Sequence, residues 1–160
     1  DSYSTSLYAI SSSGKQQMRN VVRYARNNNK GWSSGDCFEW IWKYLYRSGY
    51  GKINAYGSLP RMRNEWARHF SDYLNVSQAR LDEAGLVRLD KIGGIINPHD
   101  YRIPDGAVIV VAPGSTGTRH KYAGDIVIKD GTKFINDGPD MYYGTKSSWR
   151  GKVLGVYVPK

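Results

Sequence analysis

Residues 126–135, with the sequence IVIKDGTKFI, decide the fold class of this chain. Two runs rich in β-branched and aromatic side chains flank Asp130-Gly131, a strong short-range signal for a β-hairpin. Upstream, residues 107–112 form a continuous apolar run that is typical of a strand buried on both faces. Downstream, residues 153–158 are predicted to be a last strand. The second half of the chain is therefore predicted to form a β-sheet.

The first half of the chain shows helical periodicity instead, with apolar residues recurring every three or four positions. Helices followed by strands predict the α+β class, with N-terminal helices packed on an antiparallel sheet. The predicted helices are 15–28 after a cap at Ser12 or Ser13, about 36–47 up to Ser48-Gly49, a third with Ser58 as its cap and Pro60 in its first turn, and 79–84 after Ser77.

Composition excludes several classes of protein. The 160 residues suit one domain, 1–160, and carry 23 Lys+Arg against 14 Asp+Glu, a net charge of +9. One cysteine and three scattered histidines exclude an intrachain disulfide and predict no metal site and no cofactor. No apolar run approaches the roughly 18 residues of a membrane span. The positive charge indicates a polyanionic partner, such as nucleic acid, an anionic membrane or the bacterial wall.

The first residue is Asp1 rather than Met, which fits removal of a signal peptide or trimming of the chain. We expect a secreted protein. A lone cysteine in such a protein is either buried and inert or reactive.

Cys37 is the nucleophile that the sequence places where a helix could activate it. It follows Gly35 and Asp36 in the first turn of the second predicted helix. Unpaired backbone N–H groups and the helix dipole stabilise a thiolate there and lower a thiol pKa from about 8.5. The same N–H groups could stabilise an oxyanion. The alternative is an inert cysteine packed beside Phe38 and Ile41.

A catalytic cysteine needs a neighbouring base, and the sequence offers three histidines. His69 belongs to the third predicted helix, where a structural or surface role is expected, and His99 is predicted to be a loop residue. His120 follows a loop rich in Gly and Ser and precedes the hairpin, so it is the candidate base. The alternative for His120 is an exposed loop histidine.

The hairpin also supplies candidates for a group that orients the imidazole. If Asp130-Gly131 are the two central turn residues, alternation along the strands places Asp137 on the face of His120, and Asn136 on the other face with Asp125. We favour Asp137, with Asn136 as the second candidate. A bulge just before the strand would exchange the two. The plain alternative is that both belong to the next turn.

This ordered set resembles the papain-like cell-wall amidases of the NlpC/P60 and CHAP groups. Asp36-Cys37 resembles the pair that opens the catalytic helix of that family, and Cys37-Phe38 the CHAP pattern of Cys followed by an aromatic residue. The resemblance spans residues 34–137 in order and spacing, and its further parts are 104–110 (PDGAVIV) for the strand before the catalytic histidine, 120–128 for the His-led strand and 133–137 for the strand with the polar third residue.

Two departures set the chain apart from the main family. Residues 121–125 separate His120 from the hydrophobic run that should follow it directly, and the Ser-Gly expected after Asp36-Cys37 is absent. The small size, the helical N-terminal half and the basic charge are closer to the amidase effectors delivered by type VI secretion, or to their secreted relatives domesticated by animals.

The resemblance implies a papain-like fold and hydrolysis of an amide bond in peptidoglycan stem peptides or crosslinks. It implies Cys37 as nucleophile, His120 as its partner, and Asp137 or Asn136 as the third group. It further implies a monomer that acts on peptidoglycan outside the cell or in the target periplasm, with a cognate immunity protein as a candidate partner.

Two other functions compete with this interpretation. A glycosidase acting on peptidoglycan needs two carboxylates, and Glu39 lies just past Cys37, although we interpret it as paired with an arginine. A basic module that binds nucleic acid fits the charge and the many tyrosines, but no known fingerprint occurs and we rank it second. Tyr142, Tyr143 and Trp149 could form a stacking wall for substrate, although packing is the commoner role for such residues.

Overall fold

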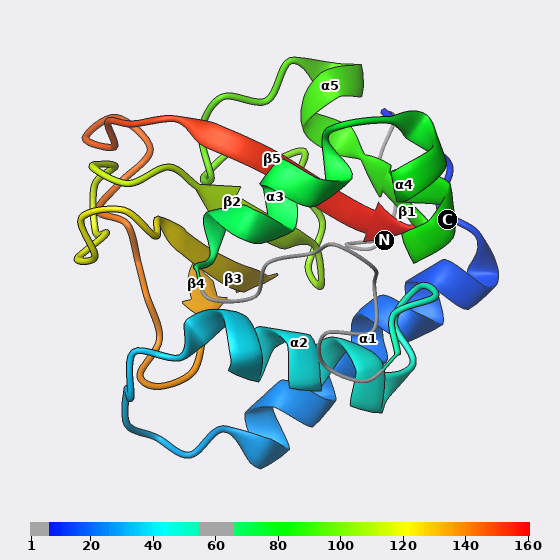
Figure 1. The fold of residues 1–160 in the computed structure, drawn as a ribbon, viewed down its shortest axis with the longest axis horizontal. Coiled ribbons are helices and arrows are strands. Elements are labelled where there is room, and N and C mark those ends of the chain that lie inside the picture. The colour runs from blue at the N-terminus through cyan, green and yellow to red at the C-terminus, as the bar shows by residue number, and fades with distance from the viewer. Residues whose placement is uncertain (1–6, 55–65) are drawn as a thin grey trace.

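The computed structural model describes residues 7–54 and 66–160. Its strands form a five-stranded sheet in the order β1-β5-β2-β3-β4, and each neighbouring pair is antiparallel (Figure 1). The predicted α+β class, with helices packed on an antiparallel sheet, is confirmed. The elements are α1 (Ser12–Asn28), α2 (Cys37–Ser48), α3 (Arg68–Leu74), α4 (Gln78–Ala84), β1 (Leu86–Arg88), α5 (Leu89–Gly93), β2 (Val108–Val111), β3 (Asp125–Asp130), β4 (Lys133–Ile135) and β5 (Val153–Pro159).

Capping residues explain most of the helix boundaries. Helix α1 is capped by Ser11, whose hydroxyl accepts the Gly14 N–H at 3.0 Å, so the predicted caps at Ser12 or Ser13 are one or two residues late. Helix α2 ends at Gly49, which has a left-handed conformation. Helix α4 follows its predicted cap, Ser77. The predicted cap Ser58 and the predicted first-turn Pro60 lie outside the described residues.

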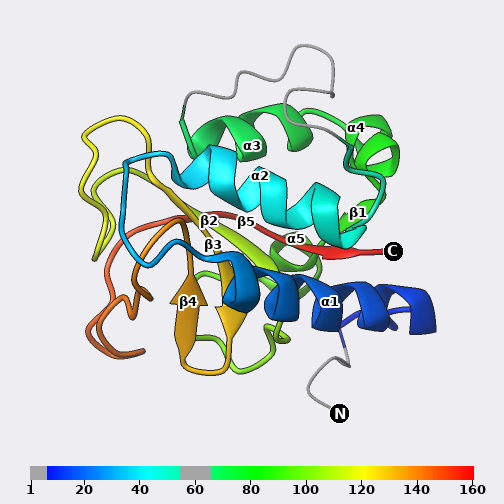
Figure 2. The same cartoon turned by 90° about the horizontal axis from the view of Figure 1, so that it is seen from below.

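Helix α2 lies between α1 and α3 (Figure 2) and packs on β3. Five of its twelve residues are buried, as its broad apolar circumference predicts. The ring of Phe38 stacks on Trp42 with centroids 5.9 Å apart, and both rings meet Phe70 of α3 edge-on at 6.2 Å. These contacts fix the position of the first turn of α2, which carries Cys37.

The central strand of the sheet is buried. All four residues of β2 are fully buried, as predicted for a strand covered on both faces. In the β3–β4 hairpin, Asp130 pairs with Lys133 and Lys129 with Phe134, so the loop is Gly131-Thr132 and the predicted Asp130-Gly131 turn is wrong by one residue. Gly131 has φ +64°, which suits the first position of a type II′ turn.

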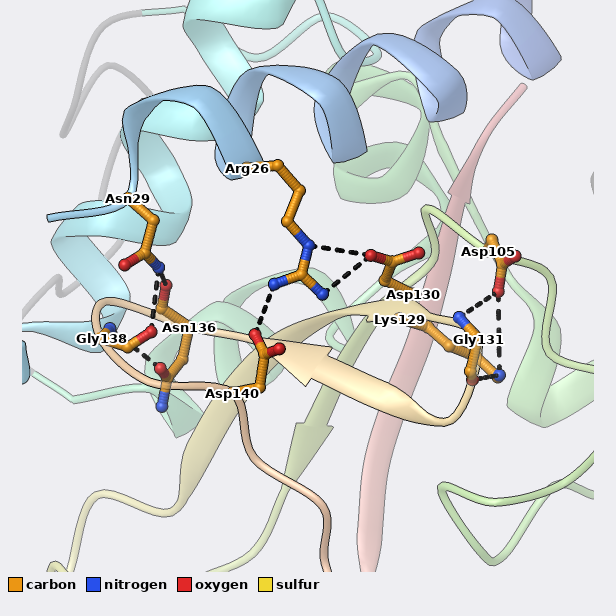
Figure 3. Close-up of polar contacts among 9 residues, drawn as sticks. All are labelled: Arg26, Asn29, Asp105, Lys129, Asp130, Gly131, Asn136, Gly138 and Asp140. Carbon is orange, nitrogen blue, oxygen red and sulfur yellow. Dashed lines mark hydrogen bonds and ion pairs between the residues drawn. The ribbon is translucent and has the colours of Figure 1, made fainter. Parts of the chain in front are cut away.

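The end of α1 is tied to this hairpin by side chains (Figure 3). Arg26 donates to Asp130 at 2.9 Å and to Asp140 at 2.6 Å. The Asn29 amide donates to the backbone carbonyls of Asn136 and Gly138, both at 3.0 Å. The segment between α1 and α2 is therefore held beside the segment that follows β4. Both segments border the pocket described next.

Candidate functional site

A pocket of about 590 Å³ lies at the N-terminal end of α2, beside the start of β3. It brings together Cys37, His120, Asn136 and Asp137, the four residues predicted from the sequence, together with Asp125, which was not predicted as a site residue. The other residues that line it are Gly31, Trp32, Ser33, Gly35, Phe38, Trp66, Ala67, Gly117, Arg119, Ala123, Gly124, Pro139, Asp140 and Met141.

Cys37 is half-buried, and its surroundings oppose a thiolate. Burial raises the pKa of its thiol most, and the charges of Asp125 and Asp137 raise it further. The backbone N–H groups of Ile126 and Phe38 act in the opposite direction but are outweighed. The sequence predicts a lowered thiol pKa at this helix start. That prediction is wrong, because burial of the thiol, reinforced by the charges of Asp125 and Asp137, outweighs the backbone N–H groups.

Asp125 is the residue that sequence reasoning missed. It is 7% exposed and is the first residue of β3. Burial raises the pKa of its carboxyl to about 6, while hydrogen bonds from Tyr143, the Ile126 N–H and the Cys37 thiol act to lower it. The signal that could have revealed it was its place at the head of the hydrophobic run 126–128.

Tyr143 holds this carboxyl in place. Its hydroxyl donates to Asp125 Oδ2 at 2.6 Å, and the ring is buried. Tyr143 has a positive φ of +56°, and no other non-glycine residue in the described ranges has a positive φ. Its ring lies so close to Gly117 that a Cβ there would approach it to 2.7 Å. Tyr143 and Trp149 are buried, so the packing interpretation holds for both, whereas Tyr142 is exposed.

His120 lies in the loop before β3, not at the strand start, and it is exposed. Its Nδ1 accepts the backbone N–H groups of Tyr122 at 3.1 Å and Ala123 at 3.0 Å. The neutral ring therefore carries its hydrogen on Nε2. Its ring lies 6.0 Å from that of Trp66 and 6.4 Å from that of Tyr122. Both hydrogen bonds of His120 within the described residues stay in its own loop.

Asp137 and Asn136 follow β4 and are buried. The Asp137 carboxylate accepts the Ser34 N–H at 3.1 Å and the Ser33 hydroxyl at 3.4 Å, so it holds the segment that leads into α2. The Asn136 side chain accepts the Gly138 N–H at 3.0 Å, a local turn contact (Figure 3). Their hydrogen bonds therefore support the Cys37 side of the pocket.

The other candidate residues lie elsewhere. His69 is buried and accepts the Trp66 N–H through Nδ1, and His99 Nε2 contacts the Tyr143 carbonyl at 3.1 Å. Among the described residues, Glu39 lies 3.9 Å from Lys43, and no ion pair joins it to an arginine there. Within residues 7–54 and 66–160, no group of three His, Cys, Asp or Glu side chains is arranged to hold a metal ion. No helix in these ranges combines the length and apolar character of a membrane span.

Comparisons with known proteins give the fold. No family model matches the chain, and no curated protein matches it. Among solved structures, the chain is similar to the crystal structure of the type VI native effector–immunity complex Tae3–Tai3 from Ralstonia pickettii. The TM-score is 0.50 with 23% sequence identity, over 89% of this chain and 97% of that chain. The chain therefore shares the α+β fold of a type VI effector.

Proposed function

We propose that this protein is a bacteriolytic cysteine amidase or endopeptidase that hydrolyses an amide bond in the stem peptides or crosslinks of peptidoglycan. The observation that carries the proposal is the pocket in which Cys37, at the first turn of α2, meets His120, Asp125 and Asp137. The fold of a type VI effector supports an antibacterial role, and the motif resemblance to cell-wall amidases supports the substrate. The net charge of +9 suits an anionic envelope.

The proposed roles follow from the chemistry of amide hydrolysis. Cys37 Sγ attacks the carbonyl carbon, and backbone N–H groups of the first turn of α2 stabilise the oxyanion. In the proposed mechanism the proton of the Cys37 thiol passes to His120 as the sulfur attacks, and the imidazolium so formed protonates the leaving amine and returns to the neutral ring. Water then releases the thioacyl group and restores the thiol.

The third residue of the proposed catalytic set is given a structural role. Asp137, with Asn136 as the second candidate, completes the polar set of the pocket. The hydrogen bonds of Asp137 to Ser33 and Ser34 support a role in placing the approach to Cys37. In the unliganded protein, backbone N–H groups orient the imidazole of His120.

The proposal extends to the setting in which the enzyme works. Residues 1–160 form a single papain-like amidase domain that acts as a monomer, outside the producing cell or in the periplasm of its target. A cognate immunity protein would bind over the pocket and exclude peptidoglycan. The Tae3–Tai3 structure is an effector–immunity complex, which supports a partner of this kind.

Digestion of purified peptidoglycan tests the proposal. The wild-type protein should release fragments with new amino groups, identified by mass spectrometry, whereas new reducing sugars would indicate a glycosidase. Cys37→Ala should lower the rate at least about 10³-fold, since it removes the nucleophile. Circular dichroism should show that the variant stays folded. Full activity of folded Cys37→Ala would refute a cysteine mechanism.

A further inference from the structure

Exposed aromatic rings lie at the edge of the pocket that contains Cys37. Trp32 and Trp66 both line this pocket, and Trp32 is 60% exposed. Tyr122, which is also exposed, stacks on Trp66 with ring centroids 5.9 Å apart and ring planes 26° from parallel. Apolar surface that is exposed beside a cavity marks a binding site more often than isolated apolar residues do. A ligand in the pocket therefore has aromatic surface within reach beside Cys37.

The backbone that carries Trp32 is held in place, although the side chain is exposed. The Asn29 side chain accepts the Gly31 N–H at 2.7 Å and donates to two carbonyls of the chain after β4. These two segments pack so closely that a Cβ at Gly138 would lie 2.8 Å from the carbonyl carbon of Trp32. A ring on a fixed backbone loses less freedom when it meets a ligand, which favours binding.

The Trp66–Tyr122 pair is supported in a similar way. The ring of His69 lies 5.2 Å from that of Trp66 and 22° from parallel with it. The Arg68 N–H, at the start of α3, donates to the Ala123 carbonyl at 2.8 Å. The pair is therefore anchored both to α3 and to the loop before β3.

A cationic side chain lies over each of the three rings. The distances from cation to ring centroid are 4.3 Å for Lys30 on Trp32, 5.0 Å for Arg68 on Trp66 and 5.5 Å for Lys121 on Tyr122. This surface suits a ligand that combines flat faces able to stack on the rings with anionic groups able to meet the cations.

Peptidoglycan has both features. Its sugar rings present faces of C–H groups, which the negative face of an aromatic ring attracts, and its stem peptides carry carboxylates. Nucleic acid also combines flat rings with negative charge. The acidic side chains of Asp125 and Asp137 in the same pocket, however, oppose a chain that carries a charge at every phosphate. The surface therefore favours a glycan.

We propose that Trp32 and the stacked pair Trp66–Tyr122 bind the sugar rings of a peptidoglycan glycan strand, so that a stem peptide attached to the strand enters the pocket of Cys37. The cations over the rings meet stem-peptide carboxylates. The choice of peptidoglycan rests on the proposed function. The enzyme should accordingly prefer stem peptides attached to glycan to free ones.

Calorimetric titration with hexa-N-acetylglucosamine, a sugar chain without peptide, tests the aromatic site directly. Cys37→Ala serves as the parent protein, because it lacks the proposed nucleophile. Adding Trp32→Ala should weaken the affinity about tenfold, as expected for loss of a tryptophan at the centre of a contact, whereas Trp32→Phe should keep most of it. Tyr101→Ala is the matched control. Tyr101 is an exposed ring with Lys146 5.9 Å from its centroid, it does not line the pocket, and its loss should change the affinity by less than about twofold.

Hydrolysis tests the preference for attached peptides. In the otherwise wild-type enzyme, Trp32→Ala should raise KM for peptidoglycan about tenfold and leave kcat unchanged, because the lost contact is made equally in the ground and transition states. With stem peptides freed from the glycan, both constants should equal those of wild type.

The outcomes separate this inference from the proposed function. If peptidoglycan is not hydrolysed, the proposed function fails, and the sugar titration still decides whether the aromatic site exists. Hydrolysis with unchanged sugar affinity and unchanged KM in Trp32→Ala would overturn the inference alone. Absence of sugar binding by the parent protein would also overturn it, as would a Trp32→Ala that weakens binding of a thymidine dodecamer instead of the sugar. Melting curves check that each variant is folded, and Tyr122→Ala replaces Trp32→Ala if the latter is not.

Discussion

The floor and the rim of the pocket differ in how they are held. We call Cys37, Asp125 and Asp137 the floor; they come from α2, β3 and the chain after β4, and Tyr143, which does not line the pocket, donates a hydrogen bond to Asp125. The rim consists of His120 and the aromatic residues Trp32, Trp66 and Tyr122. Trp32 and Tyr122 are 60% and 53% exposed. The floor is therefore largely buried and acidic, and the rim is largely exposed and aromatic.

This difference shows how one pocket can hold groups with opposing demands. Burial favours a neutral thiol at Cys37, whereas the side chain of His120 is exposed to solvent. In the proposed mechanism, the nucleophile and the proton donor therefore lie in different environments.

After the loss of Cys37, the largest expected effect is at the rim. His120→Ala should lower kcat/KM for peptidoglycan by about 10²–10⁴-fold, the usual contribution of a general acid or base. The melting temperature should hardly change, because the ring is exposed. Lys121→Ala, the exposed neighbour in the same loop, is the matched control and should retain activity. If His120→Ala hydrolyses peptidoglycan at the wild-type rate, proton transfer belongs to the floor, and the division between floor and rim fails.

The buried carboxyl of Asp125 should change how the free energy of unfolding depends on pH. The pKa of Asp125 is about 6 in the folded protein against a reference of 3.8, so the folded state binds more protons between these values. The stability contributed by Asp125 should therefore fall through this pH window as the buried carboxyl ionises. Relative to wild type, the free energy of unfolding of Asp125→Asn should rise by about 2–3 kcal/mol between pH 4 and pH 7.

Urea denaturation at a series of pH values measures this difference. Asp100→Asn is a control of opposite sign, because a hydrogen bond from Arg102 lowers the pKa of Asp100. The stability that Asp100 contributes is present above its unfolded pKa and is lost as pH falls through the folded one. Parallel curves for wild type and Asp125→Asn would mean that the floor carboxyl is hydrated.

The smallest expected effect is that of the ion pairs through which Arg26 anchors α1 to the hairpin. Arg26→Ala removes two ion pairs that join α1 to Asp130 and Asp140, and should lower the free energy of unfolding by about 1 kcal/mol, because these side chains are partly exposed. Arg23→Ala, on the same helix and without an ion pair among the described residues, should change it by less. Equal effects for both arginines would show that the floor does not depend on this anchor.

Local patterns anticipated a large part of this molecule. The hairpin, the buried strand β2, the Ser77 and Gly49 helix boundaries and the place of Cys37 at the start of α2 all follow from nearby residues. Strand β1 and helix α5 were not predicted from the sequence, because segments of three and five residues are too short to show a hydrophobic periodicity. The hairpin register was missed by one residue because Asp130 stays paired with Lys133.

By itself, the sequence predicted the α+β class from periodicity and chain order, and its resemblance to cell-wall amidases predicted that Cys37, His120, Asn136 and Asp137 lie together, as they do in the pocket. Only the tertiary structure decided which charged side chains lie near the sulfur of Cys37. Asp125 and Tyr143 come from segments separated along the chain, and burial, a property of the packed whole, sets the sign of the Cys37 pKa shift. A helix start alone predicts a thiolate, whereas the assembled floor predicts a thiol.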